Sequence, residues 1–159
     1  MTTTTRTDPD TDSGTLPRAR RVDELLAHYG ENHRHPGNEI IHFIAIPLIT
    51  VSLVGMLFAL HPYAAYAFVA FSVGYYARLS VVFFVTMVLW SALIIALVFA
   101  MGSLVLPLSI AIFVGAWILQ FIGHKIEGKK PSFFDDIKYL WVGPLFVVSR
   151  LLKKTGLSW

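Results

Sequence analysis

The chain has no cysteine and carries little charge. Its 159 residues include 13 lysines and arginines and 10 aspartates and glutamates, together 14% of the sequence, whereas a soluble domain carries about 25%. The lack of cysteine excludes disulfides and thiolate metal sites, so any metal must be held by histidine, carboxylate or backbone groups. Such ligands suit iron, manganese or zinc. Apolar residues, in contrast, make up 55% of the chain, which indicates an integral membrane protein.

The net charge of +3 is modest, and the basic residues gather near both ends of the chain. They fit loops that face anionic lipid better than a surface for nucleic acid. Residues 1–19 are rich in threonine, aspartate, proline and glycine and cannot bury enough apolar surface to fold, so we expect a disordered tail. No apolar core follows the start, which argues against a secretory signal. Residues 20–154 would form the membrane-embedded domain.

An amphipathic pattern begins at Arg21. Its inward stripe consists of Val22, Leu25, Leu26, Tyr29 and His33. This spacing predicts a short helix that lies on the membrane surface. The pair Pro36-Gly37 should end that helix, and Asn38 is expected to cap the next one.

Four apolar runs follow, at about 40–60, 63–77, 79–101 and 103–123. A membrane-spanning helix needs about 20 residues, with about 17 as the usual minimum, so three runs are long enough and the second is short. Arg78 at its end could reach the interface. Tight turns separate the first run from the second and the third from the fourth, so neighbouring helices should be antiparallel. We predict an all-α fold: an integral membrane four-helix bundle with amphipathic interfacial helices before the first span and after the last.

The basic residues also predict the topology. They precede the first span, occur at Arg78 between the second and third, and follow the fourth, while the other two turns have none. The positive-inside rule therefore places both termini in the cytoplasm, at a bacterial inner membrane or the endoplasmic reticulum. A fifth span over 133–152 would carry Lys153 and Lys154 to the outer side, so we predict a kinked interfacial or re-entrant helix there.

Polar residues gather where the first span begins and the last span ends, and this topology brings both ends to one membrane face. The histidines are His33, His42 and His124, and Glu127 follows His124 by three residues, which places both on one helix face. Ionisable groups are costly at membrane depth and are candidates for function. Imidazoles with a carboxylate form a ligand set that non-haem iron uses.

Three further polar residues accompany this cluster. Asn38 and Gln120 could orient the imidazoles, and Tyr29 could donate to a bound oxygen species or simply pack. Structural alternatives stay open, because His42 could bond a backbone carbonyl and Glu127 could pair with a lysine at the helix end. Among the remaining histidines, His35 stays open as a fourth nitrogen ligand but is expected to be exposed. His28 is expected to be solvated, and His61 is given no role in the site.

These residues form two spaced motifs: Tyr29-x3-His33-x4-Asn38-x3-His42-x4-Pro47, then Gln120-x2-Gly123-His124-x2-Glu127-x3-Pro131, with Gly143-Pro144 further on. Over residues 20–152 this order resembles the small membrane 2-hydroxy fatty acid α-dioxygenase family. Its eukaryotic members sit in the endoplasmic reticulum and act in phytosphingosine breakdown to odd-numbered fatty acids. The resemblance implies an Fe(2+)-dependent oxygenase that uses molecular oxygen to remove one carbon from a 2-hydroxy acyl chain. It implies His33, His42 and His124 as metal ligands.

Two other classes of protein stay open. A zinc-dependent lipid hydroxylase or hydrolase would use similar ligands, and metal analysis would distinguish it. A non-catalytic membrane scaffold would use the histidines structurally. A transporter fits less well, because its polar groups should lie near the bilayer midplane, where this chain is almost wholly apolar. Under the oxygenase interpretation, the partners are a fatty-acyl substrate, molecular oxygen and membrane lipid.

Overall fold

In a computed structural model of the chain, residues 18–30, 35–128 and 139–156 are described, and every regular element among them is a helix. The elements are α1 (Arg18–Gly30), α2 (Pro36–Leu60), α3 (Pro62–Ala77), α4 (Val81–Ala100), the short 3-10 helix η1 (Gly102–Leu104), α5 (Val105–Glu127) and α7 (Val142–Thr155). The all-α prediction is confirmed for these residues. Residues 1–17 of the predicted tail lie outside them.

Three stretches are long and apolar enough to cross a membrane: Pro36–Leu60, Val81–Ala100 and Gly102–Glu127. They correspond to the first, third and fourth predicted spans. The second predicted span is α3, a helix of 16 residues. At 1.5 Å per residue it is about 24 Å long, shorter than the roughly 30 Å of a hydrocarbon core.

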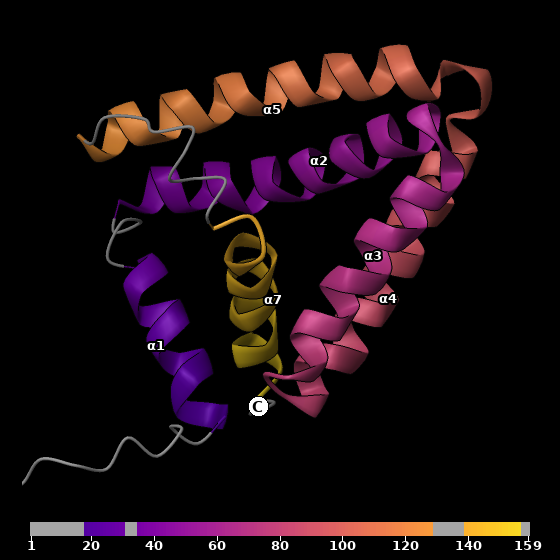
Figure 1. The fold of residues 1–159 in the computed structure, drawn as a ribbon. Helices are drawn as coiled ribbons and strands as arrows, with labels where there is room; N and C mark the ends of the chain where they lie inside the picture. Colours follow the sequence, from indigo (N-terminus) through magenta and orange to yellow (C-terminus); the bar gives the residue numbers. More distant parts are fainter. Residues whose placement is uncertain (1–17, 31–34, 129–138, 157–159) are drawn as a thin grey trace, which may run out of the picture.

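The long helices form two pairs rather than one parallel bundle (Figure 1). Helices α2 and α5 lie side by side, as do α3 and α4. The pairs meet in a V where α2 passes into α3 and α4 passes into α5. At this joint His61 adopts an extended backbone between two helices (φ −164°, ψ 128°), so α3 leaves in a new direction. The predicted four-helix bundle is therefore not confirmed, because α2 diverges from α3 and α4 diverges from α5 at the joint.

Helix α7 lies between the two arms of the V and joins them (Figure 1). Its residues 142–149 are all buried. On one side Leu145 and Val148 pack with Phe83 of α4, and on another Phe146 packs with Ile46 of α2. With 14 residues, α7 is too short to span a bilayer. A helix is thus present within the predicted segment 133–152, but it is largely buried in protein. The predicted interfacial or re-entrant placement is not confirmed, and residues 133–138 lie outside the described ranges.

Helix α1 uses its apolar stripe to pack against α7. Val22 is fully buried among residues of α3, α4 and α7, and Tyr29 packs on Phe146 with ring centroids 5.0 Å apart. A helix is present where one was predicted, and Val22, Leu25, Leu26 and Tyr29 of the predicted stripe pack against protein, whereas His33 lies outside the described ranges. The predicted place of α1 on the membrane surface stays a prediction.

Two hydrogen bonds attach α3 to the residue that precedes α7. The Tyr76 hydroxyl donates to the Trp141 carbonyl at 2.8 Å, and the Trp141 indole N–H donates to the Ser72 hydroxyl at 3.0 Å. Polar groups buried in an apolar environment need such partners. The contacts connect the α3–α4 arm to the chain that leads into α7.

Small side chains form the seam between α2 and α5. A Cβ added at Gly55 would overlap the Ser109 side chain, and a Cβ added at Gly123 would overlap the Asn38 side chain. Small residues allow membrane helices to approach closely. Because the seam is narrow from the joint to its open end, the first turns of α2 lie directly against the last turns of α5.

Candidate functional site

The open end of the α2–α5 seam contains a cluster of buried polar side chains. Asn38 and His42 of α2 are 0% and 1% exposed, and Gln120 and His124 of α5 are 5% and 7% exposed. The imidazole centroids of His42 and His124 lie 5.2 Å apart, with the ring planes nearly perpendicular at 87°. Two residues 82 positions apart in sequence thus face each other across the seam.

A backbone contact determines the protonation pattern of His42. Its Nδ1 lies 3.0 Å from the Asn38 carbonyl oxygen, and a carbonyl can only accept, so Nδ1 carries the proton. In the neutral ring Nε2 then holds the lone pair. The backbone-bonded alternative for His42 is therefore observed, and the same contact is the one that orients histidines that ligate metals.

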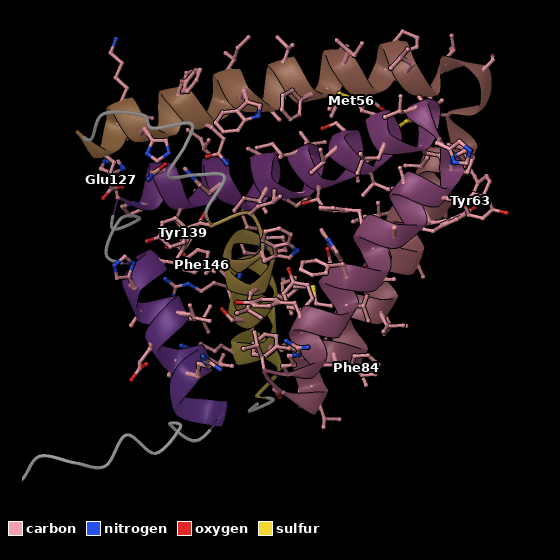
Figure 2. The ribbon with its side chains drawn as sticks, in the orientation of Figure 1. Met56, Tyr63, Phe84, Glu127, Tyr139 and Phe146 are labelled. Atoms are coloured by element: carbon pink, nitrogen blue, oxygen red, sulfur yellow. The ribbon has the colours of Figure 1, made fainter. Side chains whose placement is uncertain are left out.

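Glu127 connects the end of α5 to the start of α2. Its Oε2 accepts from the Asn38 amide nitrogen and from the His35 backbone N–H, each at 3.0 Å. Figure 2 shows Glu127 at this shared end of the two helices. A carboxylate at a helix N-terminus is also favoured by the helix dipole. Glu127 therefore holds the Asn38 side chain in the cluster.

The predicted cap of α2 was wrong. The helix begins at Pro36, and His35 caps it by accepting the Gly37 N–H on Nδ1 at 3.1 Å. Proline suits the first helical position because its missing N–H would have no intrahelical partner there. Asn38 consequently lies in the first turn, where its side chain turns into the seam and is free for the contact with Glu127.

Gln120 and Tyr29 line a small cavity of about 50 Å³ one turn further along the seam. The Gln120 side-chain oxygen is buried with no hydrogen-bond partner among the described residues. Thr50 and Tyr139 also line the cavity. Tyr139 was not predicted for the site, because it lies in the segment 133–152 that the sequence predicts as an interfacial or re-entrant helix. The cavity has room for a small polar group that could donate to Gln120.

The structure brings together five of the residues predicted for the site, and Tyr29 lies across the adjoining cavity. Those five are Asn38, His42, Gln120, His124 and Glu127. His33 lies outside the described ranges. Within those ranges no three histidine, aspartate or glutamate side chains form a group that could hold a metal ion, so metal ligation stays a prediction. The three histidines outside the predicted ligand set, His28, His35 and His61, are exposed.

Replacing Glu127 by alanine should destabilise the shared end of α2 and α5. The change removes the acceptor of two hydrogen bonds, one of them from the buried Asn38 amide, and such losses cost about 1–3 kcal/mol. Thermal unfolding in detergent, followed by circular dichroism, measures the effect. Glu24 is exposed on α1. Glu24→Ala is therefore the matched control and should leave the thermal unfolding midpoint unchanged. Equal midpoints for both variants would contradict the anchoring role.

The described residues thus define an all-helical protein with three candidate membrane spans and a buried imidazole pair at the open end of a helix seam. Residues 19–155 match the family described as "2-hydroxy-palmitic acid dioxygenase Mpo1-like", and the chain belongs to this family. The resemblance inferred from the two motifs is confirmed.

A curated relative supports the same assignment. The 2-hydroxy-palmitic acid dioxygenase MPO1 of Saccharomyces cerevisiae is 29% identical over 138 residues, which cover 82% of this chain and 79% of the relative. No solved structure matches the chain significantly.

Proposed function

We propose that the chain is an Fe(2+)-dependent α-dioxygenase that shortens 2-hydroxy fatty acids by one carbon with molecular oxygen. The observation that carries this proposal is the buried pair of imidazoles, His42 and His124, whose ring centroids are 5.2 Å apart. Family membership and the printed name of the yeast relative support the reaction class.

The donor chemistry of the cluster fits iron. Neutral imidazole nitrogens suit this metal, and the hydrogen bond from His42 to the Asn38 carbonyl leaves Nε2 as the donor atom. The third proposed ligand, His33, precedes His35 by two positions in the sequence, and the His35 backbone belongs to the same cluster through Glu127. Iron, when bound, would supply the oxygen-activating redox chemistry.

The chain's own residues would orient the reactants. We assign Asn38 and Glu127 to holding the His42 end of the cluster, through the 3.0 Å contact between their side chains. Gln120 and Tyr29 would receive the polar head of the substrate, because both line the small cavity beside the imidazoles. The Gln120 oxygen would accept from the 2-hydroxyl group, and the Tyr29 hydroxyl could donate to a carboxylate or oxygen species.

The apolar exterior would hold the acyl tail in the bilayer. The proposed orientation keeps both termini and the cluster at the cytoplasmic face, where most of the lysines and arginines lie in the sequence. The start of α2 and the end of α5 lie on the same side of the membrane if α3 and α4 both cross it. The same holds if α3 and α4 both stop short of crossing it. The site's location therefore does not depend on whether the 16-residue α3 spans fully.

The deciding experiment is a turnover assay on the full chain. Protein purified without oxygen and supplied with iron is incubated with 2-hydroxy palmitate and then exposed to oxygen, and mass spectrometry follows the acid one carbon shorter. We expect that product from 2-hydroxy palmitate and none from palmitate, which lacks the hydroxyl group. Iron-loaded protein without the product would reject the proposal, and zinc-dependent turnover would favour the hydroxylase or hydrolase alternative.

A further inference from the structure

An open groove of about 550 Å³ lies between the first half of α2 and the end of α7. Its apolar wall is formed by Ile40, Phe43 and Ile44 of α2, and its basic wall by Arg150, Lys153 and Lys154 of α7. The volume falls in the range of about 300–1,000 Å³ that is usual for small-molecule sites.

The basic wall has a net positive charge. Glu39 is the acidic residue among the described lining residues, and its carboxylate pairs with Arg150 at 2.9 Å. Three cations and one carboxylate leave the groove at +2. The guanidinium of Arg150 also lies over the Phe146 ring, 5.1 Å from its centroid. Two contacts thus position Arg150, and the neighbouring side chains of Lys153 and Lys154 are exposed.

The apolar wall faces outward on a candidate membrane span. Ile40 and Ile44 lie one turn apart on α2 and are 62% and 53% exposed. In a bilayer this surface would meet acyl chains, and the lysine side chains could reach from it to the headgroup region. An amphiphile with a negative head and an acyl chain matches both walls.

This groove is distinct from the imidazole cluster. His42 lies in the seam with α5, whereas Ile40 and Ile44 are each two residues from it, about 200° around the helix at 3.6 residues per turn. An acyl chain along Ile40 and Ile44 would therefore lie on the opposite side of α2 from the imidazoles.

We propose that the groove binds an anionic phospholipid, with one acyl chain along Ile40 and Ile44 and the phosphate beside Lys153 and Lys154. The inference is independent of the proposed dioxygenase activity. It predicts preference for net negative lipids, because a zwitterionic headgroup returns a positive charge to the basic wall.

The test uses a phosphatidylglycerol probe with a photoreactive diazirine in one acyl chain, at a trace level in phosphatidylcholine nanodiscs that hold the full chain. After irradiation, mass spectrometry of the digested protein should find the probe on residues 36–44. The Lys153→Gln, Lys154→Gln double variant should label on the order of tenfold less, since each basic residue near an anionic surface contributes severalfold to affinity. The Arg21→Gln, Arg78→Gln variant removes the same charge elsewhere and should label like the wild type.

Three results would overturn the proposal. One is equal labelling of residues 36–44 by a phosphatidylcholine probe with the same diazirine. Another is unchanged labelling in the double lysine variant. The third is displacement of the probe by 2-hydroxy palmitate at a mole fraction no higher than that of the probe, which would make the groove a fatty-acid site.

Discussion

Replacing His124 by alanine should abolish both iron binding and the shortening of 2-hydroxy palmitate while the helical fold persists. His124 is 7% exposed and faces His42 across the seam, so its removal would delete one of two close nitrogen donors. The loss of turnover should exceed the roughly 10–100-fold that follows from removing a hydrogen-bond partner of a metal ligand. His42→Ala and His33→Ala should behave alike.

Iron content by elemental analysis, turnover by mass spectrometry and helicity by circular dichroism together measure this effect. His61→Ala is the matched control. His61 follows His42 by 19 residues, which is about 28 Å along the helix axis. It lies beside Tyr63 at the joint of the V (Figure 2). The His61→Ala variant should retain iron and activity. It should lose only a little stability, because the His61 side chain would no longer accept the hydrogen bond from the Tyr63 N–H. Full activity in His124→Ala would remove that residue from the site.

Replacing Gly123 by alanine should force α5 away from α2 at the cluster. The added Cβ would overlap the Asn38 amide oxygen and lie 3.2 Å from Ile41 Cγ2 and 3.4 Å from His42 Cε1. Inserting a methyl group into such a tight contact costs about 1–3 kcal/mol. We expect a lower unfolding midpoint and a large loss of turnover, because the shift would separate the two imidazoles.

Gly115 provides the matched control on the same helix. A Cβ at Gly115 would have no heavy atom within 4 Å, so Gly115→Ala should be neutral or should stabilise α5 by up to about 1 kcal/mol. Unfolding midpoints and turnover of the two variants, measured under the same conditions, separate close packing from helix propensity. If Gly123→Ala behaved like Gly115→Ala, the close approach at the cluster would not matter for the site.

The sequence predicted the cluster better than it predicted the shape of the protein. The meeting of His42 and His124 followed from counting crossings and from the distribution of basic residues, neither of which depends on side-chain packing. The break between α2 and α3 at His61 could also be predicted from the sequence, because a proline directly follows His61. The cap of α2 was missed because proline at the first position and asparagine two residues later give competing signals.

The V arrangement and the burial of α7 could not be read from the sequence. Apolar membrane helices are hydrophobic on all sides, so periodicity does not reveal which face meets protein and which meets lipid. Residues 142–149 are buried through contacts with four other helices. Those contacts depend on where distant segments lie, and no local pattern encodes them.

The two hydrogen bonds on a single oxygen of Glu127 also limit sliding of the long helices. One turn of displacement moves a helix by about 5.4 Å, which would break the contacts to Asn38 and to His35 together. The carboxylate therefore helps to fix the position of α5 along α2, together with the close contacts at Gly55 and Gly123. Longitudinal alignment, more than packing strength, is what keeps the two imidazoles opposite each other.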